Sequence, residues 1–70
     1  MSTQTIRING EEEPLHDTTV ASLLARHDIT MGTQGVAVAL NGSVLPRGYW
    51  EDTALNAGDR IEIVQARQGG

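Results

Sequence analysis

Two Asn-Gly dipeptides, Asn9-Gly10 and Asn41-Gly42, constrain the fold of this chain more than any other feature. A type I′ turn needs positive φ at both central residues, and Asn followed by Gly adopts this conformation readily. Each dipeptide lies between two strand-like segments: residues 5–8 and 11–15 flank the first, and residues 36–40 and 43–45 flank the second. The sequence therefore predicts two β-hairpins. Residues 36–40, VAVAL, are all apolar, so we expect both faces of that strand to be buried.

One amphipathic helix is predicted between the two hairpins. Thr18 or Thr19 can cap its N-terminus. Its apolar face repeats at i, i+3, i+4 and i+7, at Val20, Leu23, Leu24 and His27. We expect the helix to end near His27 or Asp28, with Ile29 and Met31 packing back onto the core.

The last third of the chain predicts a crossover followed by a final strand. Residues 47–55 fit an irregular segment with one helical turn, anchored to the core by Leu55 and by Trp50. The alternative for Trp50 is a half-exposed docking position. Residues 60–66 alternate with period two, and Ile61 and Ile63 face inward.

The order of these elements predicts an α+β fold. A mixed sheet of four to five strands wraps over one helix, and the first and last strands run parallel at its centre. With 70 residues and no cysteine, the chain forms one small domain that depends on apolar packing. We expect residues 1–66 to form this domain.

Charge narrows the classes of partner. The net charge is -4, and all five basic residues are arginines. This balance argues against nucleic acid and against anionic membrane surfaces, and it favours partners with basic surfaces. The polar N-terminus and the lack of a long apolar segment predict a cytoplasmic protein.

No catalytic or metal-binding pattern is visible. His16 and His27 lack a second ligand at i+4, and residues 11–13 (EEE) alternate between the two faces of a strand, so they do not converge on one ion. No glycine-rich loop carries the lysine of a phosphate-binding motif. We therefore expect no enzyme activity, no catalytic residue, no metal and no cofactor bound by this chain.

The C-terminus is the remaining candidate site. Arg67, Gln68, Gly69 and Gly70 follow the last predicted strand, and we expect them to project as a flexible tail. Glycine has no Cβ, so such a tail can enter a narrow channel. A terminal carboxylate is anionic at neutral pH and resists nucleophiles until it is activated, for example by adenylation. The tail therefore predicts a carrier whose cargo is attached at Gly70. The alternative is a frayed end without function.

The ordered motifs resemble a known family. VAVALNGSVLPRGYW, then L-x-x-G-D-R-I-E-I-V and the closing QGG, are similar to the ThiS family of bacterial sulfur carriers of thiamine biosynthesis. The resemblance covers Ile6 to Gly70 and implies the ubiquitin-like β-grasp fold. It also implies that a ThiF-like enzyme uses MgATP to adenylate Gly70. A persulfide protein then supplies sulfur to form a thiocarboxylate, which a ThiG-like thiazole synthase consumes.

Other functions share this fold and tail. A sulfur carrier for molybdopterin or for another pathway, a ubiquitin-like protein modifier, and a β-grasp binding module with an inert tail all remain open. The stretch from Pro46-Arg47 to Trp50 favours the thiamine pathway.

Overall fold

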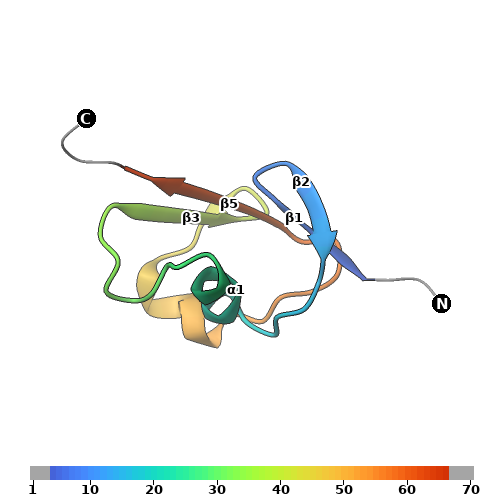
Figure 1. The fold of residues 1–70 in the computed structure, drawn as a ribbon, viewed down its shortest axis with the longest axis horizontal. Helices are drawn as coiled ribbons and strands as arrows, with labels where there is room; N and C mark the ends of the chain where they lie inside the picture. The colour runs from blue at the N-terminus through green and yellow to red at the C-terminus, as the bar shows by residue number, and fades with distance from the viewer. Residues whose placement is uncertain (1–3, 67–70) are drawn as a thin grey trace.

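A computed structural model describes residues 4–66 and contains seven elements. In chain order they are β1 (Thr5–Ile8), β2 (Glu11–Pro14), α1 (Val20–Arg26), β3 (Val36–Leu40), β4 (Ser43–Val44), the 3₁₀ helix η1 (Arg47–Asp52) and β5 (Arg60–Gln65). The sheet order is β2-β1-β5-β3-β4, with β1 and β5 parallel and the other pairs antiparallel. Figure 1 shows α1 and η1 on the same side of the sheet. The predicted mixed sheet on one helix, with parallel first and last strands, is confirmed.

Both predicted hairpin turns are present. Asn9 and Gly10 have φ of 51° and 86°, and Asn41 and Gly42 have φ of 52° and 86°. These are the positive values that a type I′ turn requires. The two hairpins are therefore encoded locally, by dipeptides that adopt this turn with little strain.

The helix begins where the sequence predicts. The Thr19 side chain caps it by accepting a hydrogen bond from the Ser22 N–H at 3.2 Å. Loss of an N-cap hydrogen bond typically lowers the stability of a protein by about 1 kcal/mol. This contribution is important for a helix of only seven residues.

The helix ends where the sequence predicts, with His27 as its C-cap. His27 is exposed, however, so its predicted place on the apolar face is wrong. The chain turns through Asp28 at φ 63°, and the Ile29 N–H bonds to the Leu24 carbonyl at 2.9 Å. Ile29, only 4% exposed, takes the core position that the helical spacing assigned to His27.

The core is built from aliphatic side chains and one indole. Its members are Ile6, Ile8, Val20, Leu23, Leu24, Ile29, Val38, Trp50, Leu55 and Ile61. Trp50 is 2% exposed, which confirms core contact over a docking role, and its Nε1 donates to the Leu45 carbonyl at 3.1 Å. The Arg47 guanidinium stacks 4.9 Å from the indole centroid and donates to the Met31 carbonyl. Met31 itself is 41% exposed, so its predicted packing on the core is wrong.

The two faces of the sheet differ sharply. Val38 on β3 points toward α1 and is 2% exposed, whereas the neighbouring Ala37 is exposed. The expectation that both faces of this strand are buried is therefore wrong. Both helical elements cover the inner face, and the small alanines on the outer face tolerate solvent (Figure 1).

Three strands end one residue before their predicted ends. In each case the next residue still makes one backbone hydrogen bond: Leu15 to Gln4, Leu45 to Val38, and Ala66 to Gly35. The predicted segments are thus correct in position to within one residue.

Candidate functional site

The predicted site residues Arg67, Gln68, Gly69 and Gly70 lie outside the described residues. The structure instead defines the point from which the chain leads into them. This point is the end of β5, where the Ala66 N–H donates to the Gly35 carbonyl at 2.7 Å. The four residues that carry the predicted site therefore follow this end of the sheet.

Gly35 fixes the last described residue by close approach. Its φ is 74°, and a Cβ at this position would lie 3.2 Å from the Ala66 carbonyl oxygen. A side chain would thus meet both backbone strain and a tight contact. This glycine lets the loop before β3 approach Ala66 closely at the end of β5.

An apolar area lies on the outer face next to this point. Val64 on β5 is 65% exposed and Val44 on β4 is 77% exposed. Ala37 and Ala39 connect them, because Ala37 pairs with Val64 and Ala39 pairs with Val44 in the sheet register. These four side chains therefore form an exposed apolar patch beside the end of β5.

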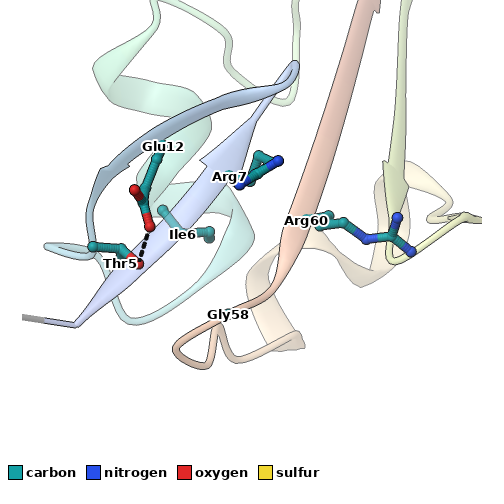
Figure 2. Close-up of a pocket in the computed structure, with 6 residues that line it drawn as sticks. All are labelled: Thr5, Ile6, Arg7, Glu12, Gly58 and Arg60. Carbon is teal, nitrogen blue, oxygen red and sulfur yellow. Dashed lines mark hydrogen bonds between the residues drawn. The ribbon is translucent and has the colours of Figure 1, made fainter.

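The other half of the outer face is charged. Arg7 and Arg60 are register partners on β1 and β5, and with Thr5 and Glu12 they line a cleft of about 220 Å³ (Figure 2). The Glu12 carboxylate accepts a hydrogen bond from the Thr5 hydroxyl at 3.0 Å. Figure 2 shows the Arg60 side chain directed away from β1, so the two guanidinium groups do not converge on one small anion.

The described part of the chain contains no recognisable catalytic centre. Residues 4–66 hold no group of three His, Cys, Asp or Glu side chains that could bind a metal ion, and both His16 and His27 are exposed. Among the described residues, the one ion pair joins the Arg26 guanidinium to the Asp17 carboxylate at 2.7 Å. The hydrogen bond that the Arg26 guanidinium donates to the Asp17 carboxylate raises the pKa of Arg26.

A membrane-crossing helix is likewise absent from the described range, where no helix is long and apolar enough to span a bilayer.

Comparison with known proteins identifies the family. The family model described as the ThiS family matches residues 3–70, which is nearly the whole chain. The chain belongs to the ThiS family. This match includes the four C-terminal residues that carry the predicted site.

Solved structures of the ThiS family have the same fold. The crystal structure of the thiamine biosynthesis protein ThiS from Geobacter metallireducens matches with a TM-score of 0.75 and 28% sequence identity, over 94% of this chain and 99% of that one. The solution structure of the thiamine biosynthesis protein from the same organism also matches at 0.75 and 28%, over 94% of this chain and 87% of that one. A comparison with curated proteins gives no match. The fold is thus the ubiquitin-like β-grasp fold.

Sequence reasoning missed the residues that hold the end of β5 in place. Gly35 appeared only as a loop glycine, and nothing local to it indicates contact with Ala66, 31 positions later (66 − 35). Asn9 and Asn41 appeared only as turn residues, although both side chains bond to the backbone of β5. A covariation signal between these positions and β5 could have revealed the contacts.

Proposed function

We propose that this chain is a sulfur carrier of thiamine biosynthesis, whose C-terminal Gly70 is adenylated and then converted to a thiocarboxylate. The observation that supports this proposal most is the family match through residue 70, which includes the Gly69-Gly70 end. The matching protein from Geobacter metallireducens is a thiamine biosynthesis protein, which agrees with this proposal.

The chemistry needs no catalytic side chain in this molecule. An oxygen of the Gly70 carboxylate attacks the α-phosphorus of ATP, and pyrophosphate leaves. The terminal sulfur of a persulfide then attacks the acyl carbon, and AMP leaves with its electron pair. A thiol cleaves the resulting acyl disulfide, which leaves the thiocarboxylate on Gly70. Adenylation is required because the free carboxylate is anionic at neutral pH and is a poor electrophile.

The described structure supports separate roles for the folded body and for the terminal residue, as this chemistry implies. Residues 4–66 form a packed body with no metal-binding cluster of acidic, histidine or cysteine side chains. Ala66 is tied to this body, so the body presents whatever follows it at one end of the sheet. The body serves for recognition, and the reacting atoms belong to the terminal residue.

The partners and cofactors follow from the same proposal. A ThiF-like adenylating enzyme binds MgATP and activates Gly70. A persulfide protein donates sulfur, and a ThiG-like thiazole synthase receives it. This chain itself binds no cofactor.

Intact mass spectrometry tests the proposal. The chain is incubated with the ThiF-like enzyme of its source organism, MgATP and a persulfide donor. We expect a mass increase equal to the exchange of one oxygen for sulfur. Deletion of Gly70 abolishes the shift, whereas Gly48→Ala, a matched control at an exposed position with open space for a Cβ, retains it.

Other outcomes identify the competing functions. Covalent ladders on target proteins would indicate a modifier, and an unchanged mass with a competent enzyme would indicate an inert tail. Loss of the gene should produce a thiamine requirement; a defect confined to molybdenum enzymes would assign the carrier to the molybdopterin pathway.

A further inference from the structure

Strand β5 has a free edge although it lies at the centre of the sheet. Its partner β1 is in register with it only at Arg7–Arg60 and Ile8–Ile61. The first hairpin then turns back at Asn9-Gly10, and β5 continues past it toward the end of the molecule (Figure 1). The C-terminal half of β5 is therefore paired with β3 on one side only.

The hydrogen-bond pattern identifies which backbone groups face this gap. The Asn41 N–H bonds to the Arg60 carbonyl, and the Ala66 N–H bonds to the Gly35 carbonyl, so the even-numbered residues of β5 bond to β3. In an antiparallel pair the intervening residues point their backbone groups away. Ile61, Ile63 and Gln65 therefore face the β1 side.

Asn9 closes only the first part of the gap. Its N–H donates to the Ile61 carbonyl at 2.9 Å, and its side-chain oxygen accepts from the Ile63 N–H at 2.7 Å. Beyond it, within residues 4–66, neither the Ile63 carbonyl nor the N–H and carbonyl of Gln65 has a hydrogen-bond partner. We call this edge, bounded by Asn9 and running along Ile63 and Gln65, the β5 notch.

Two hollows flank the β5 notch, one on each face of the sheet. The inner hollow, about 380 Å³, has an apolar floor and an acidic rim; its lining includes Ile8, Ile29, Ile63, Glu11, Glu13 and His27. The outer hollow, about 540 Å³, is lined in part by Arg7, Arg60 and Glu62. An added strand places successive side chains on opposite faces, so it would fill both hollows alternately.

We infer that the β5 notch binds an extended segment of the adenylating enzyme by strand addition. A basic side chain of that segment occupies the inner hollow. This identification of the partner rests on the proposed function. Main-chain hydrogen bonds to Gln65 provide the attachment, and the two hollows provide selectivity. A lysine or arginine fits the inner hollow because its aliphatic stem covers the isoleucines while its charge lies between Glu11 and Glu13.

Charge favours this occupant over a second copy of the chain. Pairing two β5 edges would bring together the Glu11, Glu13 and Glu62 carboxylates of both copies. Each copy also carries a net charge of -4. Such like-charge contacts oppose self-association, whereas they attract a basic segment.

Amide hydrogen exchange, measured by NMR, tests the backbone part of the inference. In the free chain the Gln65 N–H exchanges rapidly. In the saturated complex with the ThiF-like enzyme of the source organism it should slow by at least about tenfold. The Val64 N–H, which faces β3, is the internal control and stays protected in both states. An unchanged Gln65 rate in the complex overturns the inference, as does protection in the free chain that rises with its concentration.

Charge variants test the inner hollow. The double variant Glu11→Gln/Glu13→Gln should weaken binding of the same enzyme about threefold to tenfold. Glu12→Gln is the matched control because Glu12 lies on the same strand but faces the outer side, where the structure pairs it with Thr5. Equal affinities for the double variant and the control overturn the role of the inner hollow.

These results are separable from a failure of the proposed function. Sulfur loading of the wild-type chain, read by intact mass, reports on the function alone. If the wild-type chain is loaded while Gln65 exchange is unchanged in the complex, the carrier function stands and strand addition is wrong. If the wild-type chain is never loaded by a competent enzyme, the function itself is refuted.

Discussion

Asn9-Gly10 and Asn41-Gly42 are two copies of one local design. Their φ values agree within one degree, and a Cβ on either glycine would meet nothing within 4 Å. Both join two antiparallel strands at the same kind of two-residue loop. Considered only as turns, they are interchangeable.

Their asparagine side chains nevertheless bond to different parts of β5. The Asn41 side chain accepts from the Arg60 N–H at 2.8 Å and donates to the Asp59 carboxylate at 3.1 Å, so it holds the beginning of the strand. The Asn9 side chain makes one bond, to the Ile63 N–H at 2.7 Å, beyond the point where β1 has turned away.

The difference shows that a turn residue can have a second, tertiary role. Each asparagine supplies a hydrogen-bond partner to a β5 N–H that has no neighbouring strand. A buried or half-buried N–H without a partner costs about 1–3 kcal/mol. The same dipeptide thus shapes its own hairpin and helps to hold the central strand, and the second role depends on where the hairpin lies.

The largest loss of stability is expected for Asn41→Ala. This change removes two side-chain hydrogen bonds and places alanine at positive φ, so the free energy of unfolding should fall by about 3 kcal/mol. Urea denaturation followed by circular dichroism measures it. Asn41→Gly keeps the turn conformation and should recover part of the loss; equal losses for both variants would refute a role for the backbone strain.

A smaller loss, about 2 kcal/mol, is expected for Asn9→Ala, because only one side-chain hydrogen bond is removed along with the strain. Exchange of the Ile63 N–H should become faster at the same time. Equal losses of unfolding free energy for Asn9→Ala and Asn41→Ala would show that the number of side-chain hydrogen bonds does not determine the size of the loss.

The smallest effect is expected for the two glycines. Gly10→Ala and Gly42→Ala each place alanine at φ 86° in open space, so each should cost about 1 kcal/mol, and the two costs should be equal. Thermal unfolding of the two variants side by side measures this. Clearly unequal shifts would show that the turns differ locally after all.

Much of the fold follows from local patterns. Asn-Gly predicts each turn through backbone sterics, and Thr19 predicts the helix start through its capping oxygen. The apolar spacing of Val20, Leu23 and Leu24 predicts the buried face of α1, and all three are fully buried. These features depend on groups only a few positions apart, so the sequence displays them directly.

The wrong predictions concern positions that local pattern leaves undecided. The helical spacing placed His27 on the apolar face, but the helix ends before it and His27 is exposed. Of the two residues predicted to pack back after the helix, Ile29 is buried and Met31 is 41% exposed. Alanine is compatible with a buried or an exposed face, so the all-apolar β3 could not reveal that Ala37 is exposed.

The candidate site likewise has features that the sequence displays and features that only the structure shows. Gly69-Gly70 is visible in the sequence because its chemistry depends on the residue type alone, and the family match through residue 70 agrees with it. The Gly35–Ala66 contact and the β5 notch are not visible there, since both arise between segments far apart in the chain.

The two hairpins and the helix follow from the sequence alone, because backbone conformation and side-chain chemistry act over a few neighbouring residues. The carrier role of the Gly69-Gly70 end stays a prediction. Only the tertiary structure decided which face of β3 meets solvent, which residue of β5 each asparagine bonds to, and where β5 is left unpaired. These outcomes depend on how far each strand extends beside its neighbour, which is set by the packing of the whole sheet on α1 and η1.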